Sequence, residues 1–447
     1  MLKTGLYWFT NDLRVEDNSA LLRATQTVQQ LLCVYIVDPV WFAPNRYGLK
    51  SMGEHRWRFL CQTLVELEYS LNALGQQLVI VYASPLDALA ALISQHEIDA
   101  IFRSQNAGFY ETKQWQLLQQ RYRMLYFAEV ATHTLFSTSS LPFSLENVPA
   151  TFSKFKKLVE SVVNNDILAK VSCLPPPLRR VIGATPKLPP IREGRPPLLF
   201  KGGIREGNKH LLSYFSGRLP SSYKLVRNSL DGWENSTKFS PWLCNGSLSV
   251  RQILRALQNY ETDVEVNEST YWIAFELLWR EYYQWLAHAH SVRLFAQSGI
   301  KLHKPLTSFY PERFQRWCQG NTPFSLVNAC MKQLNATGYM SNRGRQIVAS
   351  AFVNELNLDW RYGAAYFEQQ LVDYDVAMNW GNWQYLAGVG VDPRGKRHFD
   401  LNKQAKLYDP DKRFITKWRG ENHQKVLDSV DAADWPIVSN KIEGDSI

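Results

Sequence analysis

Long apolar runs are missing from this chain of 447 residues. No stretch approaches the roughly 20 consecutive apolar residues that a membrane-spanning helix needs. The opening residues, MLKTGLYWFTNDLR, show neither the charged leader and apolar segment of a secretory signal nor a Ser/Arg-rich transit peptide. We therefore expect a cytoplasmic protein that does not act in a membrane.

Cysteine is scarce as well, with six residues and no C-x-x-C pair. Such scattered cysteines are typical of reduced core residues rather than of a disulfide framework or an iron–sulfur cluster. The nine histidines include no H-E-x-x-H pattern. His288 and His290 are two positions apart, so they would not share one face of a helix. The sequence therefore predicts no metal site.

No G-x-G-x-x-G follows the first β-rich segment, so a nicotinamide-type dinucleotide fold has no support. A P-loop-like pattern does run from Gly390 to Lys396. However, Arg397 stands where a Ser or Thr would bind magnesium, and no strand pattern precedes the segment. We interpret it as a basic surface loop.

The chain does carry an excess of positive charge, +9 at neutral pH with a pI of about 9.1. A basic surface suits a polyanionic partner, although charge alone does not identify one. Hydrophobic residues make up 45% of the chain and charged residues 20%, as in soluble globular proteins. The length favours two or three domains over one.

The first ~130 residues alternate short β-rich runs with helical patterns, which is the pattern of a doubly wound parallel sheet. A helical pattern from Glu54 stops near Gly75, a plausible C-cap, and another starts with Ser84 as N-cap and Pro85 at N1. The expected strands are Leu6–Thr10, Leu31–Asp38, Leu78–Tyr82, Ala100–Ser104 and Met124–Val130.

Residues 171–200 hold eight of the 21 prolines and indicate a stiff connection. Beyond it, strand signals are few. Helical windows cover Ser249–Tyr260, Tyr271–His288, Ser325–Ala336 and Arg343–Leu356. We predict an α/β domain over residues 1–135, a linker over 136–203, a larger all-α domain over 204–425 and a short tail over 426–447.

Four segments carry a specific resemblance: FTNDLRVEDN (9–18), NSTKFSP (235–241), FELLWRE (275–281) and the stretch from 342 to 385. Together they resemble the photolyase/cryptochrome family, in particular its DASH branch, over residues 5 to about 420. The resemblance implies a photolyase-like fold, in which the helical domain binds FAD. From local pattern alone, Asp17 and Asn18 of the first segment would cap a helix.

The segment 235–241 places three hydroxyls and a cation before a helical pattern, a combination that holds a pyrophosphate or simply caps the helix. The resemblance favours the first interpretation, with Phe239 where the family commonly has Leu. It implies a larger set of FAD-binding residues: Tyr223, Ser236, Thr237, Lys238, Phe239, Ser240, Arg280, Arg345, Asp373, Asp375 and Asn379.

Within that set, the resemblance makes Arg345 and Asp373 a buried ion pair beside the flavin ring, since a buried charge needs a partner. It places Asp375 at the flavin's pyrimidine edge or ribose. Asn379 would face the flavin N5, and because an amide has no titratable proton, the pocket should favour fully reduced flavin.

Glu276, Trp279 and Arg280 are three and four positions apart and would share one helical face. Alone, the pattern is typical of an amphipathic helix. By resemblance, Glu276 hydrogen-bonds a pyrimidine dimer and Trp279 stacks beside it.

Asn342, Gln346 and Tyr385 complete the set of lesion-binding residues that the resemblance implies. Gln346 and Tyr385 stand where dimer-repairing photolyases usually have Met and Trp. Stacking is worth roughly 1–3 kcal/mol per base, and flipping a base out of duplex costs a few kcal/mol. A pocket with less stacking area therefore favours single-stranded DNA.

The family's electron-transfer chain uses three tryptophans. Trp383 and Trp360 match the proximal and middle members at the family's separation of 23 positions. Thr307 stands where the distal Trp is expected, with Trp317 or Tyr310 as substitutes. Individually, each of these aromatics is more typical of a core.

The antenna site gives mixed signals. Asn106 occupies the position of a glutamate that binds methenyltetrahydrofolate in DASH relatives. The segment from Thr151 to Lys157, TFSKFKK, does resemble the corresponding segment of the branch. We expect a methenyltetrahydrofolate antenna, whose loss would lower light harvesting without abolishing repair.

Arg227 and Arg343 match DNA-contacting positions of the family, and Arg394, Lys396 and Arg397 form a basic loop that either contacts phosphates or is only solvated. The resemblance implies a monomeric lyase that uses blue light and reduced FAD to repair cyclobutane pyrimidine dimers in single-stranded DNA, with RNA as a further partner. A signalling photoreceptor is the alternative, although only 29 residues follow Trp418.

Overall fold

The computed structural model describes residues 1–162, 171, 173–178, 188–191, 197–391 and 397–421. They divide into two compact units. The first unit contains residues 1–227, 232–292 and 368–379, and the second contains 228–231, 293–367 and the described residues from 380 onward.

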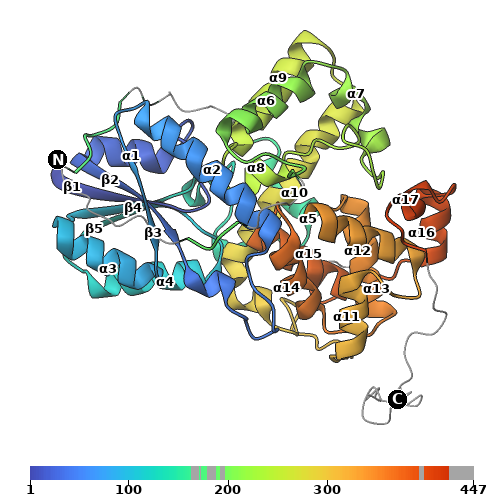
Figure 1. The fold of residues 1–447 in the computed structure, drawn as a ribbon. Helices are drawn as coiled ribbons and strands as arrows, with labels where there is room; N and C mark the ends of the chain where they lie inside the picture. The colour runs from blue at the N-terminus through green and yellow to red at the C-terminus, as the bar shows by residue number, and fades with distance from the viewer. Residues whose placement is uncertain (163–170, 172, 179–187, 192–196, 392–396, 422–447) are drawn as a thin grey trace. The chain divides into compact units, whose positions relative to one another are not determined.

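The first unit begins with five parallel strands, coloured from blue to turquoise in Figure 1. Their order is β3-β2-β1-β4-β5, which confirms the predicted doubly wound sheet. β1 and β2 start earlier than predicted because their pairing already begins at Leu2 opposite Val28. The strands are β1 (Leu2–Phe9), β2 (Val28–Val37), β3 (Leu78–Tyr82), β4 (Ala100–Ser104) and β5 (Tyr126–Val130).

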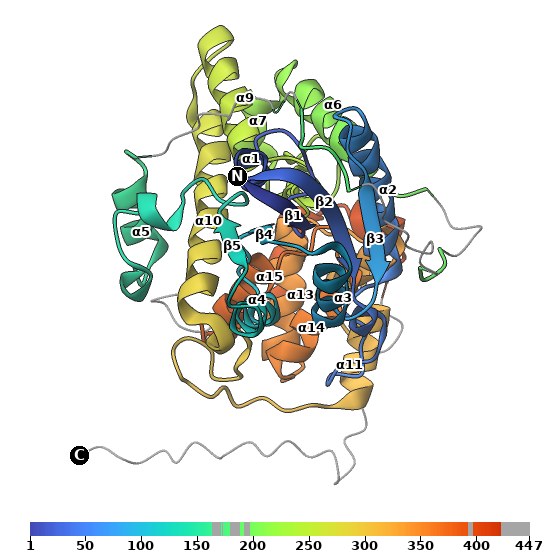
Figure 2. The same cartoon turned by 90° about the vertical axis from the view of Figure 1, so that its left-hand side faces the viewer.

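Helices cover both faces of this sheet, as Figures 1 and 2 show. Tyr7 and Phe9 of β1 pack on one face with α1 (Ser19–Thr27) and α2 (Glu54–Asn72). Leu6 and Trp8 pack on the other face with α3 (Pro85–His96) and α4 (Phe109–Arg121). The alternation follows from the two-residue period of a strand.

One of the capping predictions for these helices is correct and the other is wrong in part. Ser84 is the N-cap residue of α3 and Pro85 opens the helix as predicted, although the Ser84 hydroxyl makes no capping hydrogen bond. The Ser84 carbonyl instead accepts from the backbone N–H of Ala88. Asn18 does cap α1 through the N–H of Leu21, whereas Asp17 has a φ of 49° and its carboxylate pairs with Arg251.

The segment 9–18 is a buried joint of the first unit. The Arg14 guanidinium donates to the carbonyls of Asp17, Gly246 and Thr132 at 2.9, 2.9 and 2.7 Å. Asp12 accepts from the Tyr7 hydroxyl and from the Asn18 side chain. Two segments that are distant in sequence, around Thr132 and Gly246, are thereby tied to the residues that follow β1.

The helical part of the first unit is built on α10, a helix of 23 residues whose N-terminus is capped by Asn267. The C-terminal end of α7 packs along α10, where Lys224 N donates to the Ser269 hydroxyl. The helices here are α5 (Phe152–Val159), α6 (Ile204–Phe215), α7 (Leu219–Val226), α8 (Ser240–Cys244), α9 (Val250–Asp263) and α10 (Glu268–His290). Short 3-10 turns lie at Pro39–Phe42, Thr138–Ser140, Leu145–Asn147 and Ser291–Phe295.

The second unit packs around the fully buried Trp317, whose indole N–H donates to the Val348 carbonyl. The helices of this unit confirm the prediction that the second half of the chain is mostly helical. The helices from Pro311 onward are α11 (Pro311–Gln319), α12 (Ser325–Thr337), α13 (Asn342–Asn354), α14 (Trp360–Gln370), α15 (Val376–Ala387), α16 (Leu401–Tyr408) and α17 (Arg413–Lys417). The last residues of α14 and the first residues of α15 belong to the first unit.

Two further expectations from the sequence concern the domain boundaries and the lack of membrane-spanning helices. α5 lies inside the segment predicted as a linker, and the domain boundaries given above stay predictions. Across the part of the chain that the structure describes, every helix is too short or too polar to cross a bilayer.

Candidate flavin and substrate site

The loop before α8 presents the predicted phosphate-binding residues. Lys238 is buried and has a φ of 55°, a left-handed conformation that only tertiary contacts hold in a non-glycine residue. The His210 ring donates from Nε2 to the Thr237 carbonyl at 2.8 Å, and the Ser240 hydroxyl donates to Asp373 Oδ2 at 2.6 Å. The loop is thus tied both to α6 and to the residues just before α15.

Phe239 and Tyr223 are buried aromatics near this loop. Phe239 packs against the rings of Tyr214 and Phe215 from α6. These contacts give Phe239 a packing role, whether or not a cofactor touches it. Ser236 is half-buried.

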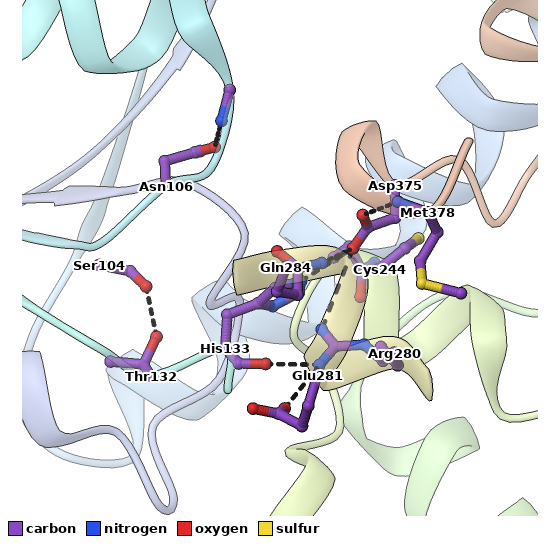
Figure 3. A network of polar contacts seen from close by, with 12 residues as sticks. Ser104, Asn106, Thr132, His133, Cys244, Arg280, Glu281, Gln284, Asp375 and Met378 are labelled. Atoms are coloured by element: carbon purple, nitrogen blue, oxygen red, sulfur yellow. Dashed lines mark hydrogen bonds and ion pairs between the residues drawn. The ribbon is translucent and has the colours of Figure 1, made fainter. Parts of the chain in front are cut away.

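Asp375 is the centre of a buried polar network (Figure 3). It accepts hydrogen bonds from Gln284 Nε2 at 2.7 Å, His133 Nε2 at 3.2 Å and the Met378 N–H at 3.0 Å. Burial alone would raise its pKa, but the donors and the Arg280 charge outweigh it and lower the pKa to about 2. Asp375 is therefore a fixed negative charge at physiological pH.

Arg280 lies beside this carboxylate and is itself only 6% exposed. Its Nη1 donates to the His133 carbonyl at 2.7 Å, and its Nη2 lies 4.0 Å from Asp375 Oδ2. Among the described residues, Nη2 finds no hydrogen-bond partner. Since a buried N–H is normally satisfied, this nitrogen suits an acceptor supplied by a ligand, such as a flavin oxygen.

Three further titratable groups surround the network. Glu281 is fully buried and accepts from the Leu135 N–H at 2.9 Å, and burial raises its pKa to about 7. Burial lowers the pKa values of His133 and His288 to about 4. Both imidazoles are neutral at pH 7, so His133 donates its Nε2 proton to Asp375.

Glu276 points to a different neighbour from Arg280, although both lie on α10. Its carboxylate forms an ion pair of 2.6 Å with Arg227, which follows the last residue of α7. The structure thus brings together a predicted lesion-binding residue and a predicted DNA-binding residue. Burial raises the pKa of Glu276, and Arg227 opposes that rise.

Trp279 is packed on one face by Phe152 of α5. The two rings are stacked with centroids 3.8 Å apart and an interplanar angle of 11°. The segment TFSKFKK forms the start of α5, with Thr151 as N-cap and with Phe152 and Phe155 buried.

Asn106 stands at the expected antenna position. Its side-chain oxygen accepts a hydrogen bond from the Gly108 N–H at 3.0 Å.

The second unit carries the other candidates. Asn342 is exposed at the start of α13, and Gln346 follows one turn later. Arg343 donates to the Asn228 side chain at 3.1 Å and lies over the Tyr408 ring, whereas Arg345 donates to the Met340 carbonyl at 2.9 Å.

Tyr385 lies under the Arg397 guanidinium, with 4.7 Å from its centre to the ring centroid. Asp373 and Asn379 belong to the first unit and are buried. The pairing of Arg345 with Asp373 stays a prediction. Arg394 and Lys396 lie outside the described residues.

The two expected electron-transfer tryptophans are both buried in the second unit. Trp383 contacts Trp317 edge-on at 6.1 Å, and Trp360 contacts Trp380 at 5.8 Å. The Thr307 hydroxyl, at the position of the missing tryptophan, is buried and has no hydrogen-bond partner in the described ranges.

His133, Glu281 and Gln284 belong to the network around Asp375, yet none of them was a candidate from the sequence. Gln284 lies four positions after Arg280, a helical spacing that could have indicated it. His133 follows the last strand in a loop and has no local signal. Within the part of the chain that the structure covers, no group of three His, Cys, Asp or Glu side chains could hold a metal ion.

Comparison with known proteins identifies the class. Residues 5–176 match the family model described as DNA photolyase, and residues 272–436 match the FAD binding domain of DNA photolyase. The cryptochrome from Synechocystis sp. PCC6803 superimposes with a TM-score of 0.88 at 35% identity, covering 93% of this chain and 88% of that one.

Individual relatives narrow the class further. Cryptochrome DASH from Idiomarina loihiensis is 54% identical over 97% of both chains, and that from Vibrio parahaemolyticus is 46% identical over 99% of both. The chain belongs to the DASH branch of the photolyase/cryptochrome family, and it contains the FAD-binding domain of that family.

Proposed function

We propose that this chain is a blue-light-driven, FAD-dependent lyase that splits cyclobutane pyrimidine dimers and prefers single-stranded DNA. The observation that carries the proposal is the buried Asp375 network with the Arg280 nitrogen that no described residue satisfies. A fixed charge and a buried free donor suit the polar edge of a flavin, and they lie in a chain with a photolyase FAD-binding domain.

The residues that hold FAD in this proposal are those that the sequence indicated: Tyr223, Ser236, Thr237, Lys238, Phe239, Ser240, Arg280, Arg345, Asp373, Asp375 and Asn379. When bound and reduced, the flavin supplies the electron that opens the cyclobutane ring under blue light. Asp375 accepts hydrogen bonds from the cofactor, because its charge does not titrate near neutral pH. Asn379 offers an amide with no titratable proton.

The chain's own contribution to the reaction is binding and orientation rather than acid–base chemistry. Arg227 and Arg343 bind phosphates, Glu276 hydrogen-bonds the dimer and Trp279 stacks on it. Asn342, Gln346 and Tyr385 provide the remaining contacts. The polar Gln346 and the single ring of Tyr385 leave little stacking energy to flip a dimer out of duplex.

Accessory features remain proposals. Trp383 and Trp360 relay electrons to the flavin, and a methenyltetrahydrofolate antenna adds light absorption. The Asn106 carboxamide oxygen accepts from Gly108, which leaves it one further lone pair and the side-chain NH2 for contacts with the antenna. RNA binding, a monomeric state and a cytoplasmic location likewise stay predictions.

The test uses photoreduced, FAD-loaded protein and UV-damaged oligothymidine, supplied as a single strand or annealed into duplex. Dimer loss is followed under blue light, with a dark sample as control. We expect light-dependent repair mainly of the single strand. Efficient duplex repair would refute the assigned role of Gln346 and Tyr385. No repair of either substrate by protein with bound, reduced FAD would refute the lyase and favour a photoreceptor.

A further inference from the structure

The ion pair between Arg227 and Glu276 joins two residues that need different partners once DNA is bound. It has a length of 2.6 Å, and the two side chains are only 14% and 30% exposed. The Arg227 guanidinium also lies 4.7 Å over the Trp272 ring. These contacts hold Arg227 against α10 in the DNA-free protein.

We propose that DNA binding causes Glu276 to become protonated. A phosphate of the bound DNA draws Arg227 away, and the Glu276 carboxylate, left without its partner, takes up one proton from solvent. The inference rests on the proposed function and deepens it. It makes Arg227 a positioning residue that keeps Glu276 ionised until nucleic acid arrives. No bond other than the O–H of the new carboxylic acid forms, and no electron moves.

The physical reason is the cost of an unpaired carboxylate in a partly buried site. When one member of a buried ion pair leaves, the remaining charge is strongly destabilised, so neutralisation is favoured. Among the described residues, Arg227 is the charge that stabilises the ionised form of Glu276, and burial acts the other way. Losing Arg227 leaves burial unopposed.

The neighbouring charges within the same unit do not replace Arg227. Lys224 of α7 pairs with Glu268, and Lys156 of α5 binds the Tyr271 hydroxyl at 2.7 Å. Arg280, one turn further along α10, donates to the His133 carbonyl.

The protonated form also fits a pyrimidine dimer better than the carboxylate does. Carbonyl oxygens of a pyrimidine only accept hydrogen bonds, and a carboxylate has no proton to donate. A carboxylic acid donates to such a carbonyl, while its second oxygen accepts from the adjacent ring N–H. Glu276 thereby becomes a donor to the oxygen on which charge develops after electron transfer.

The first experiment measures proton uptake in the dark. FAD-loaded full-length protein is titrated calorimetrically with oligothymidine, damaged or undamaged, at neutral pH in two buffers of different ionisation enthalpy. We expect uptake of up to about one proton per bound strand. The uptake should disappear in Glu276→Gln. Tight binding without proton exchange, or equal uptake by Glu276→Gln, would overturn the proposal.

The second experiment examines the protein without DNA by infrared difference spectroscopy. Compared with the unchanged protein, in which Glu281 already contributes a protonated-carboxyl signal, Arg227→Ala should show an additional carbonyl stretch at neutral pH, and this additional band should vanish when Glu276→Gln is added. Arg227→Lys keeps a cation and should lack the band. Absence of the band in Arg227→Ala would overturn the proposal.

Glu268→Gln is the matched control, because the pair Lys224–Glu268 joins the same two helices. It should take up the same number of protons as the unchanged protein. Neither experiment uses light, so a protein that takes up the proton but repairs no dimer would refute the lyase function alone. A protein that repairs dimers without proton uptake would refute only this inference.

Discussion

Replacing Glu281 by glutamine should stabilise the protein at alkaline pH and not at acidic pH. Glu281 is fully buried on α10 and accepts from the Leu135 N–H at 2.9 Å and from the Trp285 indole at 3.3 Å. The Arg280 guanidinium is 3.7 Å away. These contacts do not compensate for burial, which raises the pKa of Glu281 from 4.5 to about 7.

The sign follows from the direction of that shift. A raised carboxyl pKa means that the folded state holds the proton more tightly than the unfolded state does. The resulting cost is absent below about pH 4.5, grows as the pH rises towards 7, and reaches about 3 kcal/mol above it. Between about pH 5.5 and 8.5 the cost of Glu281 increases by about 2 kcal/mol. The glutamine side chain carries no charge at any pH, so the variant lacks this dependence.

The measurement is the difference in thermal midpoint between Glu281→Gln and the unchanged protein, followed over this pH range with and without FAD. The difference should move in favour of the variant by about 2 °C as the pH rises. His133 and His288 titrate in both proteins, so their effect cancels in the difference. Glu268→Gln, at an exposed pair worth about 0–1 kcal/mol, is the control. A difference that does not change with pH would refute the reasoning.

Three other substitutions test the packing described above. Arg14→Lys should lose at least two of the three hydrogen bonds to the carbonyls of Asp17, Gly246 and Thr132. We expect the free energy of unfolding, measured by chemical denaturation, to fall by about 2–4 kcal/mol. An unchanged denaturation midpoint would contradict the role of the buried joint. Gly363→Ala would place a Cβ 2.2 Å from Trp383 Cη2. We expect the free energy of unfolding to fall by about 1–3 kcal/mol and flavin photoreduction to become slower. Gly217→Ala, which has open space around its Cβ, is the neutral control. Phe152→Ala removes the ring stacked on Trp279. We expect the free energy of unfolding, measured by thermal denaturation, to fall by about 3–5 kcal/mol and the binding of damaged oligothymidine to weaken. Undiminished affinity for the oligonucleotide would show that Trp279 needs no support from α5.

The sheet was predictable because its strands carry their own pattern. Leu6 and Trp8 alternate with Tyr7 and Phe9, and each set fills one of the two cores. The errors lie at chain positions where a tertiary contact decides, as at Asp17, which faces Arg251 rather than the first turn of α1. A single sequence has no local signal for such a partner.

The candidate site was predictable in part for the same reason. Motif resemblance indicated Arg280 and Asp375 as FAD-binding residues, and in the structure Arg280 Nη2 lies 4.0 Å from Asp375 Oδ2. His133 could not be found, because it reaches Asp375 across 242 positions of sequence. The contact between Arg227 and Glu276 has no local sequence signal either, because it depends on the packing of α7 against α10.

The joint around Arg14 affects how distant members of this family should be recognised. The D-L-R-x-x-D-N pattern that helps to identify the chain ties β1 to the Thr132 and Gly246 carbonyls, so it holds together segments of the fold and also the backbone just before His133. A homologue without light-driven chemistry would still need the pattern in order to fold. Searches based on the pattern should therefore collect such homologues as well, and a match to it is evidence for the fold rather than for an activity.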